Sequence, residues 1–111
     1  MLFIRNLNQI RMHRGDSFTE TFKVLTGTEL DFSEYTFTEN DKIYFGLMEP
    51  NQPWENAIAK KLISYSDLKI SLNPKDTMCL LPGLYYYQIK CKLGTGEVYT
   101  LLPKNAFYIL E

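Results

Sequence analysis

The sequence is poor in the residues from which most active sites are built. His13 is the only histidine in 111 residues, and the two cysteines, Cys79 and Cys91, form no CxxC motif. A single histidine leaves little scope for Ser-His-Asp or Cys-His catalysis, or for a histidine-rich zinc site. We therefore expect no enzyme activity, no metal and no cofactor, with His13 a solvated side chain on a strand.

The sequence also lacks an excess of either charge and any long apolar run. Its net charge is -1, from 12 basic and 13 acidic residues, so we expect no nucleic-acid partner. No apolar run approaches the ~20 residues of a membrane span, so we expect no membrane partner. The first residues lack the apolar segment of a secretory signal. We expect synthesis in a cytoplasm, where both cysteines remain reduced thiols.

Two short motifs invite a functional interpretation, but turn chemistry accounts for both. Arg14-Gly15-Asp16 matches the integrin tripeptide, and we interpret it as a turn that ends a strand, with Gly15 free to adopt positive φ. Gly94-Thr95-Gly96 lies between two strands, so it predicts a hairpin and not a phosphate loop. The acidic stretch 26–41 matches no calcium-loop spacing, and we expect it to be a loop pinned by Tyr35 and Phe37.

What the sequence has in abundance is aromatic residues, eight Tyr, seven Phe and one Trp, in segments of alternating polarity. Ile43, Phe45 and Leu47 alternate with more polar neighbours, as expected for a strand with one buried face. Similar alternation recurs near residues 10–12, 18–24, 58–64, 68–72, 84–91, 97–102 and 107–110. We predict a single all-β domain over 1–111, an immunoglobulin-like antiparallel β-sandwich of about seven to eight strands. A small barrel is the alternative.

A corner precedes the strand that begins near residue 84. The segment NPKDTMCLLPG, from Asn73 to Gly83, is too short for a full helix, so we predict one short helical turn near 75–81. Asp76 is placed to cap that turn. Tyr85 is our candidate for a tyrosine corner, in which the hydroxyl bonds back to the backbone upstream. This arrangement stabilises the fold and is not a functional site.

The connection Glu49-Pro50-Asn51-Gln52-Pro53-Trp54 carries the only tryptophan. Pro50 and Pro53 cannot donate ladder hydrogen bonds, so the strands on both sides must end there. A stiff loop loses little conformational entropy on docking. Trp54 either folds back as a lid on the open end of the sandwich or projects to anchor a partner. The second possibility makes Pro50, Pro53 and Trp54 candidate partner-binding residues.

The amino-terminal segment is a second candidate docking element. Leu2, Phe3 and Ile4 are more apolar than a free terminus requires. We predict that residues 1–8 form an arm that pairs with a neighbouring subunit by adding a strand. The alternative is that these residues form the first strand of the domain's own sheet.

Three segments together resemble a known family. They are RGDSFTETFKV near the start, DKIYFGLMEPNQPWENAIAKK in the middle, and LLPGLYYYQIKCKLGTGEVYTLLPKNAFYIL at the end. They are similar to small immunoglobulin-like domains of structural proteins of tailed phages and prophages of gut bacteria. One such type is the N-terminal sandwich of phage baseplate upper proteins and related tail-fibre attachment domains. The likeness extends from about Ile10 to Glu111.

The resemblance implies a non-enzymatic virion protein, made in the bacterial host cytoplasm, that docks to copies of itself or to neighbouring phage structural proteins. The chain ends directly after its last strand, so we expect a baseplate or tail adaptor or a capsid decoration subunit, within a homo-oligomeric assembly. The alternative function is a small carbohydrate-binding module. In that case Trp54, with Tyr86, Tyr99 or Tyr108, would form a stacking platform on one face.

Overall fold

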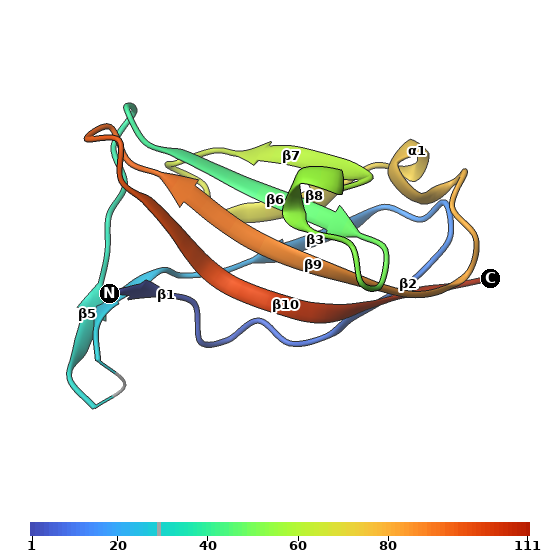
Figure 1. The fold of residues 1–111 in the computed structure, drawn as a ribbon, viewed down its shortest axis with the longest axis horizontal. Coiled ribbons are helices and arrows are strands. Elements are labelled where there is room, and N and C mark those ends of the chain that lie inside the picture. The colour runs from blue at the N-terminus through green and yellow to red at the C-terminus, as the bar shows by residue number, and fades with distance from the viewer. Residues whose placement is uncertain (29) are drawn as a thin grey trace.

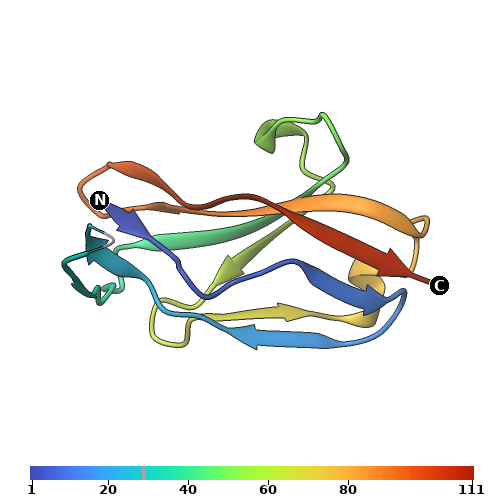
Figure 2. The ribbon, with the colours of Figure 1, turned by 90° about the horizontal axis from the view of Figure 1, so that it is seen from below.

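The computed structural model describes residues 1–28 and 30–111 as two layers of strands (Figures 1 and 2). The strands are β1 (Leu2–Phe3), β2 (Ile10–His13), β3 (Phe18–Thr21), β4 (Leu25–Gly27), β5 (Phe32–Glu34), β6 (Lys42–Met48), β7 (Ala59–Ile63), β8 (Lys69–Leu72), β9 (Gly83–Lys92) and β10 (Val98–Leu110). The helical elements are the 3-10 turn η1 (Trp54–Asn56) and the helix α1 (Pro74–Thr77). Neither has the length and apolarity that crossing a membrane requires, within the part of the chain that is described.

One layer is a five-stranded sheet in the order β2-β10-β9-β6-β7. β2 runs parallel to β10, and the other neighbours are antiparallel. The order β10-β9-β6-β7 is that of the G, F, C and C′ strands of an immunoglobulin sheet. Alternation in β6 behaves as predicted, since Ile43, Phe45 and Leu47 point inward and are at most 1% exposed.

The opposite layer contains the sheet β1-β4-β5 and the pair β3-β8. The backbone between β3 and β4 joins these parts, because the Phe22 amide donates to the Leu68 carbonyl and the Tyr35 amide donates to the Val24 carbonyl. The stretch 26–41 was expected to be a loop, and that expectation is wrong where β4 and β5 pair. Phe37 is buried and meets Tyr35 edge-on, as expected of residues that pin this segment.

The core between the layers is centred on three aromatic rings. Phe45 stacks on Tyr87 with ring centroids 5.7 Å apart, and Phe107 meets both rings edge-on. All three side chains are fully buried. Aliphatic side chains from both layers surround them. This burial supplies the apolar area that stabilises a domain of this size.

The predicted all-β sandwich is therefore confirmed, with ten strands in the described part of the chain and not seven to eight. The segments 97–102 and 107–110 were expected to be separate strands, but β10 continues through Pro103 to Leu110. The register with β9 shifts between Thr100 and Leu102 and again between Leu102 and Asn105. An irregularity of this kind tolerates a residue that cannot donate a ladder hydrogen bond.

The predicted corner is present, although its helix ends at Thr77. Asn73 and Asp76 form a capping box, in which the Asn73 amide donates to an Asp76 carboxylate oxygen over 2.6 Å. The Tyr85 hydroxyl donates to the Leu81 carbonyl over 2.7 Å, which confirms the tyrosine corner. This bond ties the start of β9 to the chain that crosses between the layers.

Replacing Tyr85 by phenylalanine is expected to lower the free energy of unfolding by about 1 kcal/mol, because the Leu81 carbonyl loses its partner. Chemical denaturation of both proteins measures the difference. Tyr65→Phe is the matched control, since Tyr65 is 41% exposed and its replacement is expected to change stability by less than about 0.5 kcal/mol. Equal losses in the two variants would contradict a structural role for the corner.

Candidate functional site

The connection between β6 and β7 stands away from the outer face of the five-stranded sheet (Figure 2, green). Pro50 and Pro53 are exposed on it, as predicted for a proline-limited loop. Its shape is held by hydrogen bonds, since the Asn56 side chain donates to Gln52 and the Lys104 ammonium donates to the Gln52 carbonyl over 2.6 Å. The loop is therefore ordered before any partner arrives.

Trp54 folds back from this loop onto the sheet, and it does not cover the open end of the sandwich. The edge of its six-membered ring lies so close to Gly46 that a Cβ there would be 2.4 Å from Cζ3. Lys60 from β7 and Lys90 from β9 place their ammonium groups 5.1 and 5.3 Å from the ring centroid, favourable cation–π distances. Trp54 is thus half-buried between a glycine and two lysines of the flanking strands.

The other aromatic residues proposed for a stacking platform do not all share one face. Tyr86 and Tyr108 alternate with buried residues of β9 and β10, so they point outward and are half-buried. The Arg11 guanidinium lies 4.8 Å from the Tyr108 ring centroid. Tyr99 pairs with the inward-facing Cys91 and packs against the core, so it lies on the opposite side of the sheet.

The amino-terminal segment is part of the domain, and the prediction of a free apolar arm is corrected. β1 pairs with β4, and Leu2 and Ile4 are buried in the core, while Phe3 is half-buried. The Ile4 amide donates to the Leu101 carbonyl, which also ties the segment to the five-stranded layer. The physical reason is the burial of these apolar side chains within the chain itself, which needs no second subunit.

Residues 5–8 are fixed in the same way. The Tyr87 hydroxyl donates to the Asn8 carbonyl over 2.6 Å, and the Asn105 side-chain amide donates to the Leu7 carbonyl over 3.4 Å. Burial is the largest cause of the raised pKa of Tyr87. The segment from Met1 to Asn8 is therefore the first strand and first crossing of the sandwich, the alternative noted from the sequence.

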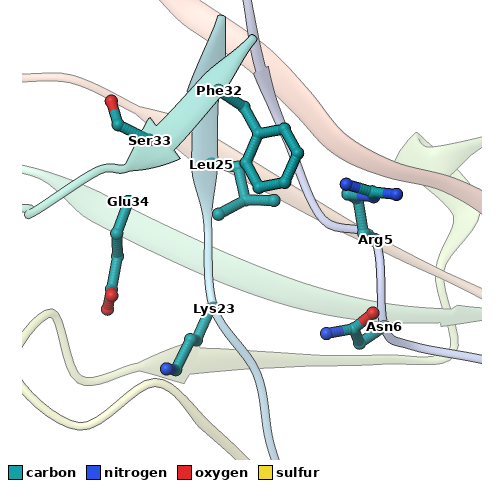
Figure 3. Close-up of a pocket in the computed structure, with 7 residues that line it drawn as sticks. All are labelled: Arg5, Asn6, Lys23, Leu25, Phe32, Ser33 and Glu34. Carbon is teal, nitrogen blue, oxygen red and sulfur yellow. The ribbon is translucent and has the colours of Figure 1, made fainter. Parts of the chain in front are cut away.

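A groove of about 410 Å³ lies beside this segment, and the sequence did not single it out (Figure 3). Its lining residues are Arg5, Asn6, Lys23, Leu25, Phe32, Ser33 and Glu34. Arg5 stacks its guanidinium over Phe32 at 4.7 Å from the ring centroid. Two cations and the Glu34 carboxylate surround an apolar floor, so the groove suits contact with charged or apolar side chains of a partner.

The Arg14-Gly15-Asp16 tripeptide forms the predicted turn. Gly15 has a φ of 82°, and the Asp16 amide donates to the His13 carbonyl. His13 is exposed and its Nδ1 lies 2.9 Å from the Glu111 carbonyl oxygen. The Gly15 amide donates to the buried hydroxyl of Thr77, so the turn is fastened to α1.

The cysteines and acidic residues are placed as follows. Cys79 is an exposed free thiol, whereas burial raises the pKa of the Cys91 thiol to about 11. Within residues 1–28 and 30–111, no group of His, Cys, Asp and Glu side chains has the geometry of a metal site. Glu29, in the acidic stretch 26–41, lies outside the described residues.

The role of Gly46 was missed from the sequence, although a signal was present. A glycine inside an alternating strand indicates close approach by another group, and here that group is Trp54. The two lysines near Trp54 gave no such signal, because they lie on other strands.

Comparison of the chain with protein-family models, with curated proteins and with solved structures gave no match.

Proposed function

We propose that this chain is a structural protein of the virion of a tailed phage or prophage, which works by protein–protein docking and not by catalysis. It is made in the host cytoplasm and then incorporated into the particle. Its partners are other copies of itself, neighbouring baseplate, tail or capsid proteins, or both. The resemblance of three long segments to phage sandwich domains supports this assignment.

The single observation that carries a docking function is the ordered loop from Glu49 to Ala57. It stands on the outer face of the sheet, and it holds Pro50 and Pro53 exposed. Its internal hydrogen bonds and the contact of Trp54 with Gly46 fix its conformation. A loop that is rigid before association loses less entropy on docking than a flexible one.

Carbohydrate binding is the alternative, supported by the outward placement of Tyr86 and Tyr108. Sugar stacking needs accessible ring faces. Lys60 and Lys90 lie over the Trp54 ring, which limits its use as a platform. A glycan array separates the functions, because specific glycan binding by the purified chain would support the alternative.

The proposal is tested on particles produced by the bacterium that encodes the chain. After induction and density-gradient purification, targeted peptide mass spectrometry is expected to find the chain in the particle fraction at a fixed ratio to the coat protein. A tagged Trp54→Ala variant is expected to be incorporated less well than a tagged Met78→Ala control, because Met78 is exposed at the end of α1. If purified particles contain no copy of the chain, the virion assignment is wrong.

A further inference from the structure

The net charge of -1 conceals a strong separation of charge within the fold. The structure describes every residue of the five-stranded sheet, and none of them is Asp or Glu. The strands of this sheet are β2, β6, β7, β9 and β10. Their cationic side chains on the outer side are those of Arg11, Lys42, Lys60, Lys90, Lys92 and Lys104, which we call the basic face. Lys61, on the inner side, is neutralised by Asp76 at 2.9 Å.

The strand register concentrates these cations. Lys42 lies directly opposite Lys92, and Lys60 lies directly opposite Gly46, beside Trp54. Like charges directly opposite on a sheet repel each other. The ion pairs among the described residues are Arg14–Glu111, Lys61–Asp76 and Lys69–Asp67, and none uses a cation of the basic face.

One end of the sandwich has the opposite character. The segments 30–41, 64–68 and 93–97 meet at this end (Figures 1 and 2), and they contain no Lys or Arg. The cations beside them include Arg5 and Lys23, which line the groove with Glu34, and Lys69, which pairs with Asp67. Their described carboxylates are those of Asp31, Glu34, Glu39, Asp41, Asp67 and Glu97, which we call the acidic end. Asp41 accepts hydrogen bonds from Thr38 and Gly94, which lower the pKa of its carboxyl group and link two of the three segments.

We propose that the basic face of one copy docks against the acidic end of a second copy. This inference rests on the proposed docking function and names the two surfaces that perform it. The contact joins different surfaces of the two copies, so repetition of it gives a ring or an open filament. Complementary charge of this kind steers association and fixes which surfaces meet.

A second copy fits the observations better than a nucleic acid does. The chain carries both complementary surfaces, and its net charge of -1 produces little overall repulsion between copies. Proteins that bind single strands offer aromatic ring faces on which bases stack. Trp54 instead turns its ring edge to Gly46 and has lysines over its ring.

The test uses two variants that each disable one surface. The face variant carries Lys42→Gln, Lys60→Gln and Lys92→Gln. The end variant carries Glu34→Gln, Glu39→Gln and Asp67→Asn. All six side chains are exposed, so both variants are expected to fold, which circular dichroism and thermal melting check.

Analytical ultracentrifugation then compares the proteins alone and mixed. Wild type is expected to self-associate at low salt, and its dissociation constant is expected to rise roughly tenfold between ~50 and ~300 mM NaCl. Each variant alone is expected to be monomeric. A mixture is expected to form a 1:1 dimer and nothing larger, because the face variant supplies only an acidic end and the end variant only a basic face.

The inference is overturned if wild type stays monomeric at ~0.5 mM protein and low salt, or if either variant associates as wild type does. Binding of a single-stranded oligonucleotide by the basic face, without self-association, would also overturn it in favour of a nucleic-acid partner. A monomeric chain that is still found on purified particles would refute this pairing alone. Self-association of a chain absent from particles would refute only the virion assignment.

Discussion

Replacement of Phe107 by alanine is expected to lower the free energy of unfolding by about 3–5 kcal/mol. Phe107 is fully buried in β10 and meets Tyr87 of the adjacent strand β9 and Phe45 of β6, the next strand beyond β9. Its removal takes away the edge-on contacts to both rings and leaves a cavity that the surrounding strands fill only in part. Domains of this size have total stabilities of about 5–15 kcal/mol. The variant is therefore expected to lose about a fifth or more of its stability.

Urea denaturation monitored by circular dichroism measures this loss. Phe107→Leu keeps most of the buried volume and is expected to cost less than about 2 kcal/mol. Phe32→Ala is the matched surface control, because Phe32 is 43% exposed and is expected to cost less than about 1 kcal/mol. If Phe107→Ala costs no more than Phe32→Ala, the aromatic cluster is not the centre of the core.

The sequence predicted those parts of the fold in which a single segment contains the whole pattern that defines its structure. The alternation in β6 and β9 spans enough residues to define a buried face, and the corner before β9 carries both a capping residue and Tyr85. The sequence analysis missed β4 and β5 because each has three residues, too few for a period-two pattern to appear. β1, with two residues, was recognised only as the alternative to a free arm.

The candidate docking surfaces were harder to predict because they depend on tertiary structure. The basic face draws its cations from separate strands, and only the register brings Lys42 opposite Lys92. The net charge of the whole chain adds the cations of this face to the carboxylates of the acidic end. The two nearly cancel, so the net charge does not reveal that either surface is charged. Similarly, the apolar character of Leu2 and Ile4 was read correctly, but sequence alone could not distinguish burial within the chain from burial against a neighbour.

The contact of Trp54 with Gly46 gives the second large expected effect. Gly46→Ala places a Cβ 2.4 Å from the Trp54 ring, a distance that real side chains do not adopt, in a strand held by neighbours on both sides. The ring is therefore expected to leave the sheet, at a cost of about 1–3 kcal/mol in the free energy of unfolding. Because Trp54 is the only tryptophan, its fluorescence reports the change directly, with an expected shift to longer wavelength.

A double-mutant cycle shows whether the cost comes from this contact. Once Trp54 is replaced by alanine, the ring atoms nearest to a Cβ at Gly46 are gone, and alanine in a strand is about 0.5–1 kcal/mol more favourable than glycine. Gly46→Ala is therefore expected to be destabilising with Trp54 present and neutral or stabilising in the Trp54→Ala background, a coupling energy of about 1–3 kcal/mol. An equal cost in both backgrounds, with unchanged fluorescence in Gly46→Ala, would place Trp54 away from Gly46. The loop would then be free to move, and its rigidity could not support docking.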